Sequence, residues 1–345
     1  MTLAPATTSL PAYRPLLAWL TALGTAWVFV LVKLGAFTTS IGAGMVFPDW
    51  PLSNGSLNPE GWLTDVAMFA EHSHRLSAGL MSLITIGIAI AIWKMDGRLW
   101  LRRMALFAVG LVFAQALVGG LRVLLDHLHV EMVNTSMGRL FAMVHACLAQ
   151  IYVCALLALS LGVSRPWLQP LDERAASPAS VPWRSLAVIC CGLLLLQLAV
   201  AAIMRHSFAG LAISTFPWSN ADGGLLPTDW NFRISIHFVH RAMAVILTVA
   251  LVALAVKVTR DRAASGGVKL AAQSLVGLVV VQIALGAASV LSFRTPYYTT
   301  AHVIVGALTL AGCFGLTWWS FRGRIEQAGR ASRAAVTSTP AFAQS

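Results

Sequence analysis

Four histidines stand inside long apolar stretches of this sequence: His74, His145, His240 and His302. An ionisable side chain in such a stretch is costly and usually serves a function. Two histidines on facing helices can occupy both axial positions of a haem iron. The pattern therefore predicts two bis-histidine haem sites, with His74 opposite His145 and His240 opposite His302.

Two other uses of these histidines are a hydrogen bond between helices and a zinc or copper site. A hydrogen bond suits a single histidine, but it accounts poorly for four histidines that occur as two similar pairs. A zinc or copper site would usually include cysteine or a second nearby carboxylate, and the pairs lack that pattern. We therefore expect haem iron at both pairs, and no zinc or copper.

An arginine accompanies the first histidine of each pair. Arg75 directly follows His74, and Arg241 directly follows His240. Their guanidinium groups are predicted to neutralise haem propionates. The alternative is that these arginines snorkel to lipid headgroups.

An acidic residue accompanies only one pair. Glu71 lies three residues before His74, and therefore on the same face of a helix, whereas His237 lies three residues before His240. We therefore expect the two sites to do different work, with Glu71 as the catalytic residue of the first site. The alternative is that Glu71 only opposes the positive end of a helix dipole.

The segments that carry these residues are long enough to cross a membrane. Apolar residues make up 58% of the 345 residues and charged residues only 11%, against about a quarter charged in soluble proteins. Apolar blocks of about 20 residues match the hydrocarbon core of a bilayer. An all-α polytopic membrane protein is predicted, which excludes a soluble enzyme and a nucleic-acid-binding domain. The eight expected spans are 16–37, 74–95, 104–125, 139–161, 185–205, 238–258, 269–291 and 300–321.

The basic residues between the spans predict the orientation. The net charge is +11, and most basic residues fall in the segments 94–103, 162–184, 257–269 and 322–345. By the positive-inside rule these segments and both termini are cytoplasmic, in a cell inner membrane. The spans with the histidines then all run inward from the outer face, which places the four histidines at a similar shallow depth.

The sequence repeats itself once, at a distance of 166 or 167 residues. The repeated residues are Gln115 and Gln282, Gly119 and Gly286, His74-Arg75 and His240-Arg241. Such a repeat predicts two similar structural units, and with four spans each they are parallel, pseudo-symmetric four-helix bundles. The repeated glutamines and glycines are expected to set helix packing. The expected parts are an N-terminal half, a linker, a C-terminal half and a cytoplasmic tail, at 1–170, 171–182, 183–325 and 326–345.

The cysteines and the remaining histidines are not expected to do chemistry. All five cysteines lie in apolar blocks and are interpreted as small buried hydrophobes. Four histidines without a counterpart in the repeat are interpreted as surface residues. These residues are Cys147, Cys154, Cys190, Cys191 and Cys313, and His72, His127, His129 and His206.

With these spans, halves and histidine motifs in this order along the sequence, the chain resembles the haem A synthase family over about residues 16–321. The resemblance implies oxidation of the C8 methyl group of haem O to a formyl group, for use in haem-copper oxidases. It also implies a haem b cofactor between His240 and His302, the substrate haem between His74 and His145, and an essential role for Glu71. The motifs that carry it are Pro48-Asp49-Trp50-Pro51-Leu52, Glu71-x-x-His74-Arg75, His145, His240-Arg241 and His302.

The resemblance implies partners as well. These are haem O and its synthase, a membrane or soluble electron donor, and haem-copper oxidase subunits, with no nucleic acid and with a homo-oligomer left open. Many members carry two cysteines that flank the Pro-Asp-Trp-Pro-Leu motif. Phe47 and Ser53 stand there in this chain, so we expect a mechanism without thiol chemistry.

Two other functions would also use paired haem sites. A dihaem membrane electron-transfer cytochrome would leave its haems unaltered, and it has no need of a carboxylate at one site only. A haem transporter is expected to have broken helices near the midplane, and the sequence shows no such break. The carboxylate of Glu71 therefore favours the enzyme.

Overall fold

The protein is a bundle of long helices in this computed structural model, which describes residues 11–170 and 181–329. Eight of the described helices are apolar and long enough to cross a membrane, so the prediction of an all-α polytopic membrane protein with eight spans is confirmed. The linker expected at 171–182 and the tail expected at 326–345 lie mostly outside the described residues. The eight helices are α1 (Pro15–Ser40), α2 (Val66–Met95), α3 (Leu99–Leu124), α4 (Met137–Gly162), α6 (Arg184–His206), α7 (Phe232–Arg260), α8 (Gly266–Leu291) and α9 (Pro296–Ser320).

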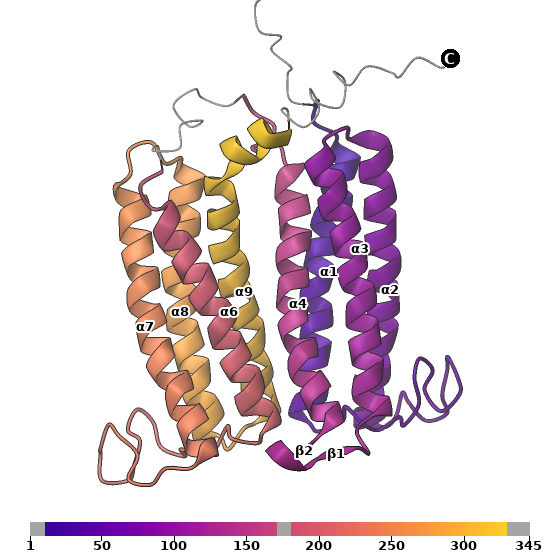
Figure 1. The fold of residues 1–345 in the computed structure, drawn as a ribbon, viewed down its shortest axis with the longest axis vertical. Helices are drawn as coiled ribbons and strands as arrows, with labels where there is room; N and C mark the ends of the chain where they lie inside the picture. The colour runs from indigo at the N-terminus through magenta and orange to yellow at the C-terminus, as the bar shows by residue number, and fades with distance from the viewer. Residues whose placement is uncertain (1–10, 171–180, 330–345) are drawn as a thin grey trace, which may run out of the picture.

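Two groups of four helices, α1–α4 and α6–α9, stand side by side (Figure 1). Two clusters of buried apolar side chains lie mostly within one group each, and Cys154 of α4 and Ala311 of α9 each join the cluster of the other group. The groups meet where α1 packs against α9 and where α4 packs against α6 and α9. The boundaries of the two halves and the symmetry axis between them stay predictions.

The two ends of the bundle differ. At one end, here called the terminal end, α1 begins and α9 ends (Figure 1). The opposite end, here called the loop end, carries the long connections 41–65 and 207–231. A short antiparallel hairpin of β1 (His129–Val130) and β2 (Thr135–Ser136) joins α3 to α4 at the loop end.

Two helices begin earlier at the loop end than the apolar blocks indicated. The predicted starts at 74 and 238 are too late by eight residues for α2 and by six for α7. The side chains of Asp65 and Asn231 cap these helices by accepting backbone N–H groups of the first turn, which stabilises that turn. The additional turns contain polar residues, so hydropathy alone did not reveal them.

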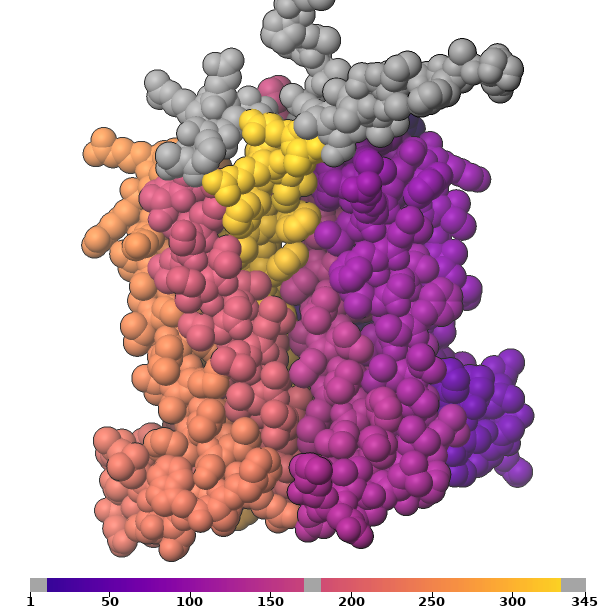
Figure 2. All heavy atoms as spheres, viewed as in Figure 1, coloured from indigo at the N-terminus to yellow at the C-terminus, as the bar shows by residue number. Residues whose placement is uncertain are grey.

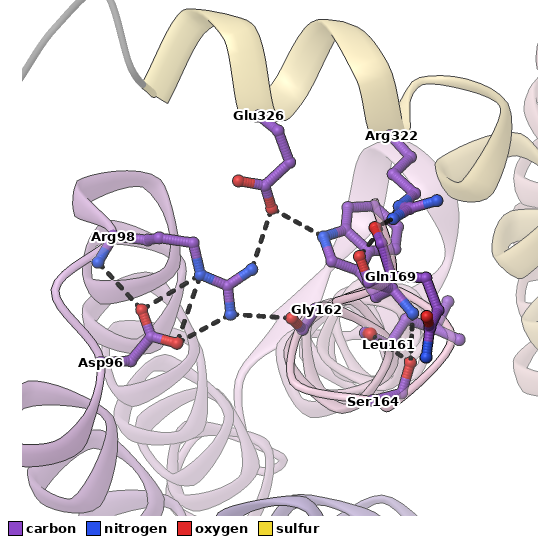
Figure 3. A network of polar contacts seen from close by, with 9 residues as sticks. Asp96, Arg98, Leu161, Gly162, Ser164, Gln169, Arg322 and Glu326 are labelled. Carbon is purple, nitrogen blue, oxygen red and sulfur yellow. Dashed lines mark hydrogen bonds and ion pairs between the residues drawn. The ribbon is translucent and has the colours of Figure 1, made fainter. Parts of the chain in front are cut away.

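A buried ionic network fastens the two groups at the terminal end (Figure 3). Arg98, between α2 and α3, pairs with Asp96 at 2.7 Å and with Glu326 at 2.9 Å. Glu326 belongs to a short helix over 322–329 and also accepts the indole N–H of Trp167 at 2.7 Å. All three charged side chains are buried, and removing one partner of such a network would leave a costly uncompensated charge. Figure 2 shows the C-terminal part of the described chain lying across the junction of the two groups.

Candidate haem-binding sites

The four candidate histidines lie at the same level of the bundle. His74, His145 and His240 each follow the first residue of their helix by eight positions, and His302 follows the first residue of α9 by six. At 1.5 Å per residue these positions are about 9–12 Å from the helix starts. The four histidines therefore lie at similar distances from their helix starts, and their depth in a membrane stays a prediction.

In the second group, the imidazoles of His240 and His302 face each other with ring centres 6.3 Å apart. Two metal–nitrogen bonds of about 2 Å each, together with the ring radii, fill a gap of this size. Nδ1 of His302 lies 3.1 Å from the backbone carbonyl of Gln282. Because a carbonyl only accepts, Nδ1 carries the proton and Nε2 keeps the lone pair that a metal ligand requires. Nδ1 of His240 lies 3.0 Å from the side-chain nitrogen of Gln197. That nitrogen only donates, so Nε2 of His240 has a lone pair for a metal when the Gln197 amide turns its unpaired Oε1 toward Nδ1 instead.

In the first group, His74 on α2 and His145 on α4 are close enough to interact electrostatically. Their Nδ1 atoms are buried and have no hydrogen-bond partner among the described residues. The backbone carbonyl of Gln115 faces His145, although the normal geometry of a hydrogen bond is not reached, and the side-chain Oε1 of Gln115 is also unpaired. The backbone carbonyl of Leu31 faces His74 in the same way. Carbonyls beside Nδ1 favour the tautomer in which Nε2 keeps the lone pair for a metal, so these two histidines fit an axial pair.

A repeated glycine lies against one histidine in each group. A Cβ at Gly119 would be 3.1 Å from Cε1 of His145, and a Cβ at Gly286 would be 3.1 Å from Cε1 of His302. The packing role expected for these glycines therefore has a specific form. They let α3 and α8 approach the histidine of the following helix closely enough to fix its ring.

Glu71 holds the first long loop. Only 4% of Glu71 is exposed, and both of its carboxylate oxygens have partners. Oε1 accepts from Arg75 at 2.6 Å, and Oε2 accepts the backbone N–H groups of Val46 at 2.7 Å and Phe47 at 3.2 Å. Glu71 is the sixth residue of α2, beyond the first turn in which a helix dipole acts most strongly. The loop contacts, rather than the dipole, therefore account for its position.

Arg75 is bound to the same loop. Its guanidinium donates to the backbone carbonyls of Asp49 at 2.7 Å, Phe47 at 3.1 Å and Leu52, in addition to Glu71. These bonds involve both terminal nitrogens of the guanidinium. The terminal N–H groups of Arg75 are therefore engaged by the loop and Glu71, and a haem propionate would have to bind at its Nε–H or displace the loop. The propionate role predicted from the sequence stays a prediction.

Arg241 holds the second long loop in a matching way. Its terminal Nη2 donates to the backbone carbonyls of Ile213 at 3.0 Å and Thr215 at 2.8 Å. Its Nε lies 3.2 Å from Nε2 of His237, and the backbone N–H of Ile213 lies 3.3 Å from Nδ1 of His237. A neutral imidazole has one acceptor nitrogen, so His237 accepts from one of these two donors at a time. His237 therefore does for the second loop what the carboxylate does for the first, and the two positions differ in charge rather than in placement.

Asp49 closes the tip of the first loop. Its carboxylate oxygens accept the backbone N–H groups of Asn54 at 2.8 Å and Gly55 at 2.7 Å. Burial opposes ionisation of Asp49, but these backbone bonds and the positive charge of Arg75 outweigh it and hold the pKa of its carboxyl below its usual value.

The surface position predicted for the remaining histidines is wrong for His72, and His206 is only partly exposed. His72 is 2% exposed and contacts the loop residues Ser53 at 3.0 Å and Leu57 at 3.2 Å, because the early start of α2 places it inside the helix. His127 and His129 are exposed, as expected. All five cysteines are free and lie in α4, α6 and α9, with four of them buried and Cys147 half-buried.

Comparison with known proteins identifies the family of this chain. A profile of the family described as cytochrome oxidase assembly protein matches residues 18–314. A protein of Bacillus licheniformis named heme A synthase is 27% identical over 282 residues, covering 80% of this chain and 86% of the relative. Heme A synthases of Staphylococcus haemolyticus and Staphylococcus aureus are 24% and 25% identical, covering 84% and 87% of this chain and 90% and 93% of the relatives. The chain belongs to the haem A synthase family.

Membership in the haem A synthase family gives the chain a class of activity. At the level of the family it is an oxidoreductase-type enzyme of haem A synthesis and cytochrome oxidase assembly, in the form of a multi-pass membrane protein. The matched range includes all four candidate histidines and both loop-holding arginines. The paired imidazoles and their carbonyl and glycine neighbours fit two haem groups.

Proposed function

We propose that the protein oxidises the C8 methyl group of haem O to a formyl group, which gives haem A, with a haem b as cofactor. The observation that carries the proposal is the pair His240 and His302, facing each other at 6.3 Å in a duplicated arrangement. In this proposal His240 and His302 hold haem b, and His74 and His145 hold the substrate haem.

The chain's own residues would prepare each site for its haem. When bound, haem b supplies one-electron redox chemistry at its iron. The backbone carbonyl of Gln282 keeps His302 in the tautomer that can bind iron, and Gly286 leaves room for the ring. The positions that flank the Pro-Asp-Trp-Pro-Leu motif hold Phe47 and Ser53 instead of cysteine, so the proposed reaction uses no loop thiol.

We assign the catalytic role in the first site to Glu71. Oxidation of a methyl group beside a porphyrin leaves electron deficiency on its carbon. A fixed carboxylate can stabilise that charge, position water or accept the departing proton. Glu71 lies about one helical turn before His74, and it would act after Oε2 leaves the backbone N–H groups of Val46 and Phe47.

The proposed location is a cell inner membrane with both termini in the cytoplasm. Two strongly basic connections, 94–103 and 257–269, lie at the terminal end together with the start of α1 and the finish of α9 (Figure 1), and such connections face the cytoplasm. Haem O would come from its synthase and electrons from a membrane or soluble donor. The product would pass to haem-copper oxidase subunits.

The decisive experiment is extraction of the haems from purified protein, produced in cells that supply haem O. We expect haem b together with haem O, a hydroxylated intermediate or haem A. Haem b alone, with added haem O left unaltered in the presence of reductant and oxygen, would overturn the proposal.

One observation favours a second candidate, a dihaem membrane electron-transfer cytochrome. His237 holds its loop and its arginine as Glu71 does, so a residue at this position has a structural use without any catalysis. The same extraction separates the two candidates, because an electron carrier would return the haems it received unchanged.

A further inference from the structure

Several arginines gather where the two helix groups meet, near the loop end. Arg122 on α3 interacts electrostatically with both His74 and His145. Arg205 on α6 interacts with Arg122, with Arg294 and with His302. The cluster therefore lies beside both candidate haem sites. His206, expected at the surface, is instead partly buried here and interacts with Arg122 and Arg205.

Direct contacts fix the two central arginines. Arg205 reaches across the junction and donates from one terminal nitrogen to the carbonyl of Ala36 and the hydroxyl of Ser40 on α1, each at 2.8 Å. Its Nε is buried and has no hydrogen-bond partner among the described residues. The guanidinium of Arg122 packs against Gly44, where even a Cβ would overlap it, so it lies under the start of the first loop.

The positive charge of this cluster is only partly compensated. The acids that interact with Arg122 are Glu71 and Asp126. Glu71 is already paired with Arg75, so Asp126, which also accepts a hydrogen bond from the neutral hydroxyl of Ser136, is the remaining counter-charge of Arg122. The charged groups that interact with Arg205 are themselves arginines. Buried cations without counter-ions are unfavourable, so the arrangement favours an anionic group from a ligand.

We propose that Arg122 and Arg205 bind the propionate carboxylates of the haems, Arg122 at the His74–His145 site and Arg205 at the His240–His302 site. This inference rests on the proposed binding of haem. Guanidinium groups suit carboxylates because they donate two parallel hydrogen bonds. Arg122 and Arg205 thus take the place of Arg75 and Arg241 as the carboxylate-binding residues. Terminal N–H groups of Arg75 and Arg241 are bound to loop carbonyls.

The test compares haem b with its dimethyl ester, in which both propionates are uncharged. The full-length chain is produced without haem, reconstituted in lipid nanodiscs and titrated while the absorption spectrum is recorded. Arg122→Gln is measured with His302→Ala, and Arg205→Gln is measured with His145→Ala, so that each titration reports one site. Each arginine variant should lose roughly 10- to 100-fold in affinity for haem b and keep the affinity for the ester unchanged.

Controls separate this role from a structural one. Arg122→Lys and Arg205→Lys keep the charge and should recover part of the affinity, and Arg233→Gln, at an exposed position of α7, should behave as the parent. An equal loss for haem b and for its ester, or no loss for either, would overturn the inference. The preference for haem b over its dimethyl ester could depend on these arginines in a protein that forms no haem A. That result would contradict the proposed reaction but support the binding of propionates by Arg122 and Arg205.

Discussion

Each helix group holds its long loop with an arginine at an equivalent position, but the partner of that arginine differs between the groups. In the first group Arg75 pairs with the carboxylate of Glu71, and in the second group Arg241 pairs with the imidazole of His237. Each partner also lies within hydrogen-bond distance of a backbone N–H of its loop. Position alone therefore does not distinguish a structural residue from a catalytic one. What distinguishes Glu71 is its negative charge, and the variants that test its role must change charge without changing shape.

The largest difference between the groups should appear when the iron ligands are removed. Replacing His240 or His302 by alanine should abolish the spectrum of low-spin, six-coordinate haem b, because one axial bond is lost in either case. Replacing His74 or His145 should leave that spectrum in place. Absorption and electron paramagnetic resonance spectra of the purified variants provide the measurement. An unchanged spectrum after both replacements in the second group would rule that pair out.

The next effect concerns the charge of the two loop-holding residues. Glu71→Gln keeps an oxygen that can accept a loop N–H but removes the charge, and we expect haem A formation to fall by about 10²–10³ while haem b stays bound. His237→Gln is the matched change in the second group and should leave haem A formation within a few-fold of the parent. Haem extraction and chromatography measure both.

Either of two results would contradict the catalytic assignment of Glu71. One is full haem A formation by Glu71→Gln. The other is an equal fall in His237→Gln, which would show that loop holding, common to the two residues, is what the reaction needs.

A smaller effect should follow from the glycines beside the histidines. Gly119→Ala and Gly286→Ala each place a methyl group 3.1 Å from a histidine ring carbon. Overpacking of this kind costs about 1–3 kcal/mol, so the haem affinity of the affected site should fall about tenfold or more. Gly110→Ala and Gly277→Ala lie on the same two helices with open space around the new Cβ. They should bind haem as the parent does, and equal losses in both pairs would show that helix packing in general is responsible.

The smallest expected effect is a pH dependence of the first loop. Since the pKa of Asp49 is lower in the folded protein than its usual value, its bonds stabilise the loop above the usual value of about 4. That stabilisation is lost as the pH falls through the lowered pKa. Hydrogen exchange of the peptide 49–56, corrected for the intrinsic effect of pH, should rise on acidification in the parent. Asp49→Asn should exchange faster already at neutral pH and respond less to acid.

The parts of this molecule that could be predicted from the sequence depend on hydrophobicity and on repetition. The eight spans follow from the length of the apolar blocks, and the depth of the four histidines follows from their distance to the block ends. The starts of α2 and α7 could not be located by the same rule, since the caps Asp65 and Asn231 precede turns that contain polar residues.

Other features of the site were not predicted from the sequence for a different reason. The contacts of Arg75 with loop carbonyls depend on how the loop folds back, which no local pattern encodes. Arg122 and Arg205 did carry a signal, because both are ionisable residues inside spans. The cost of burying charge in a membrane, which singled out the histidines, applies to them equally.

The ionic network at the terminal end has a consequence for biosynthesis. Trp167 and Glu326 are joined by a hydrogen bond across 159 positions of the chain. At about 5–20 residues per second, a ribosome needs on the order of 10–30 s to reach Glu326 after it has made Trp167. During that interval the first four helices can insert and pack, but Arg98 lacks its partner from the short helix 322–329. The final union of the two halves at this end must therefore be a late step, completed after the last membrane span has left the ribosome.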